Sequence, residues 1–494
     1  MLPLFMAIPL AGAAASVIIP WRWLRQTLFI ILPILSIIAG SILYHTTTTQ
    51  GPIGHSIGLY VGGVAIPFVA DGFNALMIIA TNVVTLSANI FAILSGDAKA
   101  RFYPALALML SAGSAGALLT ADLFNLFVFI EVMLLPSYAL MAMTGTWGRL
   151  AGGRTFVLTN LTASTLLLIG ATFVYATAGT TNLGALAGAA HVNGSIQAAL
   201  GIVLLAFVIK AAIFPVHTWL PRTYPSTSAS VMTLFSGLHT KVAVYAIFRI
   251  FSVTFGLDQR WSWLIVVICV ISICVGSFAG LAEATVRRIL GYQMIGGMPL
   301  ILITLAFGSQ NVLAAAIFYM VHHMITMGAL LLAAGAIEET YGTGKLVKLD
   351  GLARRDKFLA FIFAAASFSI VGFPPFSGMW GKLLLIMGIG EAGNGQAVVS
   401  IIAIIVGSFG AMLCMIRLWR EVFWGKDMDC EGRIPLRLTW PAAAMLACSV
   451  AMFIFAGPLT DMMQHASSML LDSPSYAHAI LGDGEAIGLN LGDF

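Results

Sequence analysis

Apolar stretches, each about as long as a bilayer is thick, recur along almost the whole chain. A helix needs about 20 predominantly apolar residues to cross the hydrocarbon core. About fourteen such stretches occur, each bounded by charged residues, Gly or Pro. The pattern therefore predicts an all-α integral membrane protein. We expect its transmembrane helices near residues 2–19, 27–44, 71–95, 103–120, 122–143, 154–177, 196–221, 226–252, 261–282, 290–307, 311–336, 358–387, 396–420 and 437–457.

Two segments do not fit the spanning pattern. Residues 45–70 alternate small, polar and β-branched side chains, which predicts a short hairpin on the outer face. Residues 458–494 carry Asp461, Asp472, Asp483, Glu485 and Asp493 with little apolar periodicity beyond 462–471. We expect an interfacial helix there, followed by a loose end. The apolar start has no cation before Arg22, so we interpret it as a retained helix and not as a signal peptide.

Composition supports the membrane class. Hydrophobic residues make up 60% of the 494 residues and charged residues only 9%, whereas about a quarter of a soluble protein is charged. With a net charge of +4, this composition excludes a nucleic-acid-binding protein and a disordered chain. The five Cys show no C-x-x-C pair or zinc-like spacing, and no phosphate-binding loop occurs. We therefore expect no catalytic site, no cofactor and no metal site.

The distribution of cations predicts how the chain is oriented. Most of the 24 Lys and Arg residues fall in the odd-numbered connections between the predicted helices. The even-numbered connections carry almost none, apart from Arg249 and Arg260 around the one between the eighth and ninth helices. The positive-inside rule then places both termini outside the cell membrane and favours an even number of helices.

Several ionisable residues lie well inside predicted spans, although a charge at that depth costs at least about 2.5–3.5 kcal/mol. A single residue of this kind could be a buried ion pair or a snorkelling side chain that only fixes helix packing. Together, one acid with three Lys and three His would leave uncompensated positive charge if all were ionised. Groups that alternate between charged and neutral forms can relay protons. These residues are Glu131, Lys210, His239, Lys241, His322, His323 and Lys382.

Prolines predict breaks in two of these spans. Pro215 in KAAIFPVHTWLP and Pro374 with Pro375 in VGFPPFSGMWGK cannot donate backbone hydrogen bonds and clash with the preceding turn. Transporter helices are broken in this way near binding sites, although a proline kink alone is more often a packing bend. His217 follows the first break and could equally be an exposed or capping imidazole, so it is a secondary candidate.

Helical geometry separates neighbouring candidates. His239 and Lys241 are about 200° apart around a helix, so we place only Lys241 on the main path. His322 and His323 are about 100° apart, so one could face the eighth helix and the other the twelfth. A bis-His haem site is the competing interpretation, but no two helices carry the separated His pairs that it needs.

These motifs resemble the proton-translocating antiporter family shared by Mrp-type sodium/proton antiporters and the antiporter-like subunits of respiratory complex I. The resemblance extends over almost the whole chain. Its residues are YVGGVAIPFVADGFNALM (60–77), DLFNLFVFIE (122–131), KAAIFPVHTWLP (210–221), GLHTKVAVYAIFR (237–249), RRILGYQMI (287–295) and FPPFSGMWGK (373–382).

The resemblance implies a fourteen-helix fold with two inverted five-helix repeats, helices 4–8 and 9–13, in which helices 7 and 12 are broken. The corresponding divisions are residues 1–100, 101–255, 256–425 and 426–494. It also implies that Glu131 and Lys210 form a glutamate–lysine pair, with Lys241 central and Lys382 terminal in a hydrophilic axis. Asp122, at the start of the glutamate motif, is secondary.

The resemblance further implies a transport subunit and not an enzyme. Its partners would be Mrp-type subunits A, B, C, E, F and G, protons, sodium ions and the lipid bilayer.

The sequence departs from the family's motifs at two places. Met327 occupies the position of the family's helix 11 lysine, so that His322, His323 and water would replace that lysine. The family's Asp-x-Lys-Arg motif reads Thr285, Val286, Arg287 and Arg288 here, so its cations are kept but its acid is lost, and we assign that loop no transport role. The alternatives are a proton-pumping subunit of a complex I or membrane hydrogenase assembly and a purely structural subunit.

Overall fold

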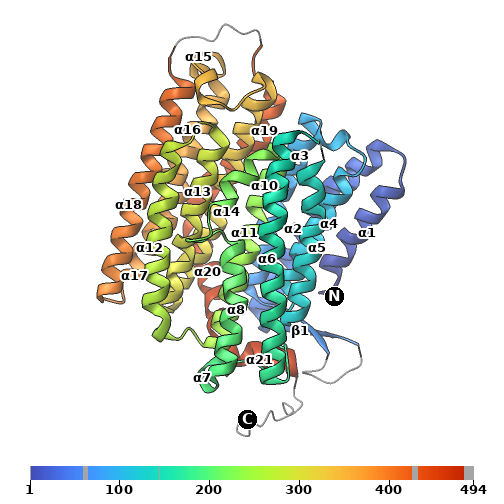
Figure 1. Cartoon of the computed structure of the whole chain (residues 1–494), viewed down its shortest axis with the longest axis vertical. Helices are drawn as coiled ribbons and strands as arrows, with labels where there is room; N and C mark the ends of the chain where they lie inside the picture. The colour runs from blue at the N-terminus through green and yellow to red at the C-terminus, as the bar shows by residue number, and fades with distance from the viewer. Residues whose placement is uncertain (1, 59–64, 144, 426–431, 483–494) are drawn as a thin grey trace.

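Helices that run along the long axis of the molecule make up almost all of the computed structural model (Figure 1). The structure describes residues 2–58, 65–143, 145–425 and 432–482. Lys426 and Cys430, and the acidic positions Asp483, Glu485 and Asp493, lie outside the described residues. The predicted all-α membrane class is confirmed, because ten helical segments are long and apolar enough to cross a bilayer, and five shorter helices are also apolar.

The first half of the chain contains, among the described residues, one hairpin, eleven α-helices and two short 3-10 helices, Asp97–Lys99 and Tyr224–Ser226. The antiparallel strands are β1 (Ile53–Ile57) and β2 (Ile66–Ala70), with Ile53 opposite Ala70. The helices are α1 (Leu4–Ile18), α2 (Arg22–Gln50), α3 (Gly72–Ser95), α4 (Tyr103–Leu119), α5 (Leu123–Ala142), α6 (Trp147–Ala178), α7 (Ala189–Val192), α8 (Gly194–Lys210), α9 (Trp219–Thr223), α10 (Ala229–Gly237) and α11 (His239–Phe255).

The second half is helical throughout its described part. Its helices are α12 (Ser262–Ala279), α13 (Val286–Leu302), α14 (Gln310–Tyr341), α15 (Leu352–Arg355), α16 (Lys357–Val371), α17 (Ser377–Gly390), α18 (Gly395–Leu418), α19 (Leu436–Ile454), α20 (Ala456–Leu471) and α21 (Ser473–Leu481). The long helix α14 is almost wholly buried and packs against α3, α10, α13, α16, α17, α19 and α20, so it forms the centre of the bundle.

Both predicted helix breaks are present. The first helix ends at Lys210, five residues before Pro215, and helical structure resumes only at Trp219. The second ends at Val371 and resumes at Ser377, after the Pro374–Pro375 pair. Gly372 ends α16 with a positive φ of 105°, a conformation that glycine adopts without a steric penalty.

Two boundary predictions need correction. The hairpin was expected over 45–70, but α2 continues to Gln50, because this end of the helix keeps its backbone hydrogen bonds and its Thr hydroxyls bond to preceding carbonyls. The segment after residue 457 was expected to be an interfacial helix. Instead, α20 packs against α14 and α3 through buried Met463, Ala466 and Leu470, and the shorter α21 covers the hairpin.

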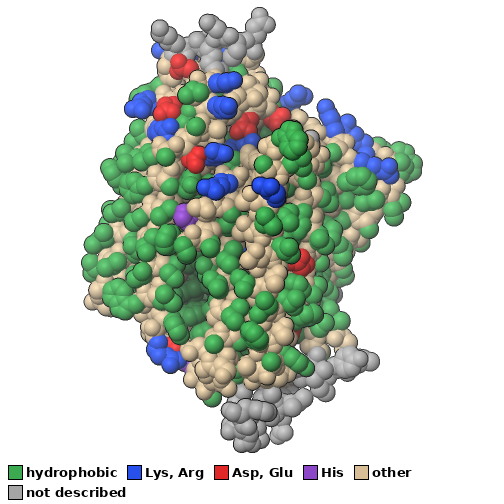
Figure 2. Space-filling model, in the orientation of Figure 1, with side chains coloured by type: hydrophobic (Ala, Val, Ile, Leu, Met, Phe, Trp, Pro, Cys, Tyr) green, Lys and Arg blue, Asp and Glu red, His purple; other side chains and the backbone are tan. Residues whose placement is uncertain are grey.

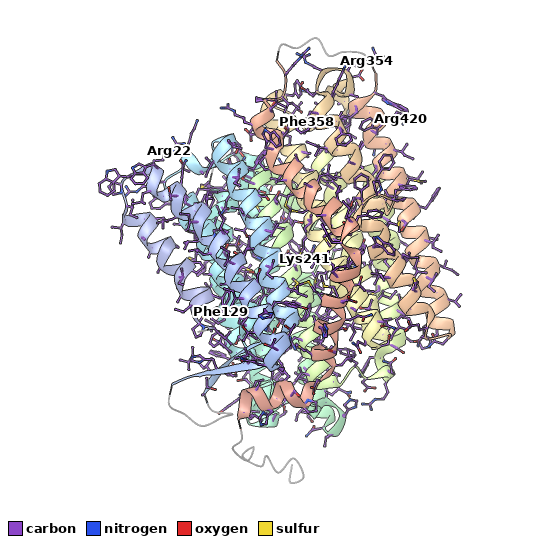
Figure 3. The ribbon with its side chains drawn as sticks, turned by 180° about the vertical axis from the view of Figure 1, so that it is seen from behind. Arg22, Phe129, Lys241, Arg354, Phe358 and Arg420 are labelled. Atoms are coloured by element: carbon purple, nitrogen blue, oxygen red, sulfur yellow. The ribbon has the colours of Figure 1, made fainter. Side chains whose placement is uncertain are left out.

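The surface agrees with a membrane environment. Hydrophobic side chains cover the middle of the face in Figure 2, and Lys and Arg gather toward the end where α15 lies. From behind, Arg22, Arg354 and Arg420 lie at the same end, and Lys241 lies near the middle of the bundle (Figure 3). The hairpin and α21 lie at the opposite end (Figure 1).

Candidate functional site

Five of the predicted ionisable residues are buried inside the bundle, on helices from both halves of the chain. Lys241, His322 and His323 have no exposed surface, and Lys210 and Lys382 are only 5% and 8% exposed. They lie on α8, α11, α14 and α17. Removing so many ionisable groups from water is costly unless each finds a partner, so their contacts show how the site is built.

Lys241 and His323 form the centre of the site. The Lys241 ammonium nitrogen Nζ lies 3.0 Å from His323 Nδ1 and 3.6 Å from Met298 Sδ. Gly297 makes room for this imidazole, since a Cβ there would overlap His323 Nε2. A charged lysine donates to a neutral imidazole, so the pair can share one proton but cannot easily hold two positive charges.

His322 points to a different helix from its neighbour. Its Nδ1 lies 2.7 Å from Ser377 Oγ, at the start of α17, and 3.2 Å from Thr326 Oγ1. The predicted separation of the two imidazoles is therefore present, with His323 facing α11 and His322 facing α17. Met327, at the position where the family resemblance implied a lysine, is fully buried.

Lys210 occupies the last turn of α8, where the helix is broken. Its Nζ lies 3.4 Å from Ser164 Oγ, and Glu131 is near enough to interact with it electrostatically. Within the described residues the two form no ion pair shorter than 4 Å. Glu131 is half-buried, and its Oε1 has no hydrogen-bond partner. The glutamate–lysine pair is therefore open in this structure.

Lys382 contacts the second break directly. Its Nζ donates to the Val371 carbonyl oxygen at 2.8 Å and to Ser408 Oγ at 2.9 Å. Val371 is the last residue of α16, where carbonyls lack helical partners and the helix dipole is negative. The broken helix therefore supplies the oxygen that binds the ammonium group.

The secondary candidates lie outside the central contacts. His239 bonds to Ser137 on α5, with Nε2 2.6 Å from Oγ, so it points away from Lys241 as its position on the helix predicted. His217 stacks on Phe214, and its Nδ1 has no partner. Asp122 caps α5 by accepting the Asn125 N–H at 2.8 Å, and it also accepts the Thr181 hydroxyl.

Sequence reasoning missed a buried ion pair between Asp71 and Arg249. Arg249 Nη2 lies 2.5 Å from Asp71 Oδ2, and the two side chains are 3% and 0% exposed. Asp71 also caps α3, and Tyr476 of α21 stacks on the guanidinium at 4.5 Å. The sequence did contain an N-cap signal, Asp followed three residues later by Asn, but nothing local identified an arginine 178 residues away.

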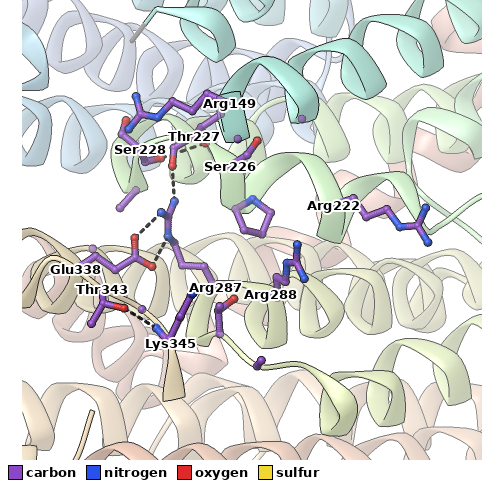
Figure 4. A pocket seen from close by; sticks show the side chains of 18 of the residues that line it. Arg149, Arg222, Ser226, Thr227, Ser228, Arg287, Arg288, Glu338, Thr343 and Lys345 are labelled. Atoms are coloured by element: carbon purple, nitrogen blue, oxygen red, sulfur yellow. Dashed lines mark hydrogen bonds and ion pairs between the residues drawn. The ribbon is translucent and has the colours of Figure 1, made fainter. Parts of the chain in front are cut away.

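A polar cavity of about 1270 Å³ opens on the cation-rich side of the bundle (Figure 4). Buried Arg287 holds its wall together by bonding both carboxylate oxygens of Glu338 and the Thr227 carbonyl. The cavity reaches Gly335 on α14, about 18 Å along that helix from His323 at 1.5 Å per residue. Its cations are Arg149, Arg222, Arg287, Arg288 and Lys345.

These groups can bind and pass protons but offer no metal site. No cluster of three or more His, Cys, Asp or Glu side chains in the described part of the chain could hold a metal ion. A neutral imidazole, a deprotonated lysine amine and a carboxylate each have a lone pair that can accept a proton.

Comparisons with known proteins show which family this chain belongs to. The family described as NADH:quinone oxidoreductase/Mrp antiporter, TM, matches residues 120–411. The D subunit of the Na(+)/H(+) antiporter of Alkalihalophilus pseudofirmus is 32% identical over 435 residues, covering 86% of this chain and 87% of the relative. The protein of the same name from Bacillus subtilis is 31% identical over 456 residues, covering 90% and 92%.

A solved structure is similar over nearly the full length. A chain of the Mrp complex from Dietzia sp. DQ12-45-1b superposes with a TM-score of 0.93 at 36% identity, covering 97% of this chain and 99% of that chain. The protein is therefore a multi-pass membrane transporter subunit and not an enzyme, and it belongs to the family of the Mrp antiporter D subunits and the antiporter-like membrane subunits of complex I.

Proposed function

We propose that this chain is the proton-translocating subunit of a multisubunit sodium/proton antiporter in the cell membrane. Protons pass along Glu131, Lys210, Lys241, His323 with His322, and Lys382. The observation that carries the proposal is the 3.0 Å contact between Lys241 Nζ and His323 Nδ1 at fully buried positions. The names of the Alkalihalophilus and Bacillus relatives support sodium as the exchanged cation.

The proposed path is not a continuous chain of contacts, so protons would cross it in separate steps. Lys241 and His323 are in direct contact, whereas Lys210 and Lys382 have separate partners, Ser164 and Ser408. Water or side-chain movement must therefore complete the path at its two ends. We propose that the open Glu131–Lys210 pair is a charge switch, because bringing the carboxylate to the ammonium would stabilise the charged lysine and separating them would release its proton.

The arrangement in the membrane is part of the proposal. We count fourteen crossings if α8 with α9 is one broken span and α16 with α17 is another. The two breaks occupy corresponding places in the proposed inverted repeats, residues 101–255 and 256–425. The polar cavity on the cation-rich end would then be a cytoplasmic vestibule for protons, with both termini outside.

The proposed function also requires partner subunits. Mrp-type subunits A, B, C, E, F and G would assemble with this chain and provide the sodium path. The similarity to a chain of the Dietzia Mrp complex supports such an assembly.

The test is sodium-dependent proton flux in everted vesicles that carry the whole co-expressed complex. Lys210→Ala, Lys241→Ala and Glu131→Gln are each expected to abolish flux while the complex still assembles. Lys348→Ala, a change of the same type at an exposed lysine outside the cavity and the relay, is the matched control and should keep full flux. Replacing sodium by potassium in the same assay tests the cation.

The alternatives give different results in this experiment. A subunit of a complex I or membrane hydrogenase assembly would copurify with a dehydrogenase module and show no sodium-driven flux. A purely structural subunit would retain flux after Lys210→Ala and Lys241→Ala. Either outcome would contradict the proposed function.

A further inference from the structure

A closed ring of hydrogen bonds surrounds one nitrogen of His322. From His322 Nδ1 the ring runs through Ser377 at 2.7 Å, Ser449 at 2.7 Å, Ser369 at 2.9 Å, Thr326 at 3.1 Å, and back to Nδ1 at 3.2 Å. Its members come from α14, α16, α17 and α19, and none is more than 1% exposed. The proposed relay uses only the histidine of this ring.

The second break brings two of these helices together. Ser377 is the first residue of α17, immediately after the proline pair and Phe376. Gly378 allows α17 to approach so closely, because a Cβ at that position would overlap the Ser369 carbonyl oxygen and lie 3.0 Å from His322 Cε1. The ring is therefore a tightly fitted part of the structure.

Counting protons shows which form of His322 the ring favours. Four hydroxyls supply four donors, and the ring contains five contacts. With a proton on Nδ1, the imidazole donates to Ser377, and Ser377, Ser449 and Ser369 each donate to the next hydroxyl of the ring. The Thr326 hydroxyl can no longer donate to Nδ1, but it can rotate toward a carbonyl of its own helix, as helical threonines commonly do. In the other neutral tautomer Nδ1 carries no proton and Nε2 does. Nε2 has no hydrogen-bond partner, so this tautomer leaves a buried donor unsatisfied.

We propose that Ser377, Ser449, Ser369 and Thr326 are positioning residues that keep a proton on His322 Nδ1 and leave Nε2 free as the proton-accepting atom. A proton bonds to the Nε2 lone pair and gives an imidazolium. It then leaves Nε2 for the next base, and the electron pair returns to the nitrogen. Nδ1 donates to Ser377 throughout, so no group in the ring has to reorient during transfer.

The surroundings of His322 agree with this role. The titratable side chains that face it are His323, Tyr319 and Lys382, the last through electrostatic interaction. Ser449 lies on α19, outside both proposed repeats, so the ring would make a helix beyond the repeats necessary for fast transport.

The inference rests on the proposed function, and both are tested in one vesicle assay. Ser449→Ala and Ser369→Ala are each expected to lower sodium-dependent proton flux about three- to tenfold, the factor that one net hydrogen bond supplies, and to shift its pH profile. Because the ring acts as a unit, the double variant should be no slower than the slower single variant. Ser449→Thr, which keeps the hydroxyl, should restore flux.

Ser400→Ala is the matched control. Ser400 is a fully buried helical serine whose hydroxyl bonds to the Gln396 carbonyl of its own helix, outside the ring. Its flux and pH profile should equal those of the wild type. Assembly of every variant is measured by copurification, and Ser369→Ala replaces Ser449→Ala if the latter does not assemble.

The outcomes separate this inference from the proposed function. If Lys241→Ala abolishes flux but Ser449→Ala and Ser369→Ala keep the wild-type rate and pH profile, the ring has no positioning role. Additive losses in the double variant would also overturn it. If Lys241→Ala retains flux, the relay itself is wrong, and any effect of the serines is only structural.

Discussion

Removal of the Asp71 charge should destabilise the protein strongly, because it leaves Arg249 buried without a counter-ion. Asp71→Asn keeps the size of the side chain and an oxygen that can still cap α3. Breaking one side of a buried pair costs about 3–5 kcal/mol. The stacking of Tyr476 on Arg249 does not offset this cost, since it is present before and after the change. We expect a loss of at least about 3 kcal/mol, because the single amide oxygen cannot replace both Oδ1, which caps α3, and Oδ2, which accepts from the guanidinium.

Thermal melting of the purified complex can measure this loss. An unfolding entropy of about 2.1 cal/mol/K per residue amounts to about 1 kcal/mol/K for 494 residues, so about 3 kcal/mol lowers Tm by about 3 °C if the chain melts cooperatively. Asp461→Asn, on the exposed side of α20, is the control and should lie within about 0.5 kcal/mol of the wild type.

A double variant shows whether the charge is the cause. Asp71→Asn combined with Arg249→Gln removes both charges and should recover most of the loss, because no unpaired ion remains. A single-variant loss below about 1 kcal/mol, or a double variant as unstable as the sum of the singles, would refute the argument.

Three further changes test the close contacts of the site. Gly297→Ala should lower flux at least about tenfold with assembly intact, because the added Cβ would displace the His323 imidazole from Lys241. Gly201→Ala adds a Cβ that meets open space, so this control should keep the wild-type flux. Equal flux in the two variants would contradict the prediction. Gly378→Ala should lower the yield of the complex and its free energy of unfolding by more than about 2 kcal/mol, measured as a lower Tm, because its Cβ meets a backbone oxygen. Gly395→Ala, which meets open space, is the control. Arg287→Leu should cost about 1–3 kcal/mol in a melting experiment, because partly exposed Glu338 and the Thr227 carbonyl lose a charged donor; unchanged melting would show that the pair is not stabilising.

Much of the fold could be predicted from the sequence because the bilayer imposes simple rules on helices. A spanning helix must be long and apolar, and proline cannot continue one, so the helices and both breaks could be placed from residue order alone. The course of α20 was not readable in this way. Its amphipathic sequence fits a membrane surface or a helical bundle equally well, and only the neighbouring α3 and α14 decide between them.

The residues of the site could be predicted from the sequence where they are ionisable, because an ionisable side chain is costly to place in a membrane. Lys241 and His323 stand out in an apolar sequence, and the angles around their helices predicted which neighbours diverge. Hydroxyl groups do not stand out. Ser400 and Ser449 look alike in sequence, since serines in apolar helices commonly bond to their own backbone, and only the meeting of four helices turns Ser449 into part of a ring.

Each broken helix has a buried lysine beside its break, one in each half of the chain. Lys210 is the last residue of α8 and its ammonium donates to Ser164 of α6, whereas the Lys382 ammonium binds the carbonyl of the last residue of α16 and so lies at a negative helix end. Lys241 is the third residue of α11, and its Nζ contacts His323 and Met298, neither of which carries a negative charge. A positive charge is therefore better stabilised at Lys382, and at Lys210 when Glu131 approaches it, than at Lys241. In the proposed relay, Lys241 would be the position that a proton occupies only briefly, and the Lys241–His323 contact would separate two resting sites for charge.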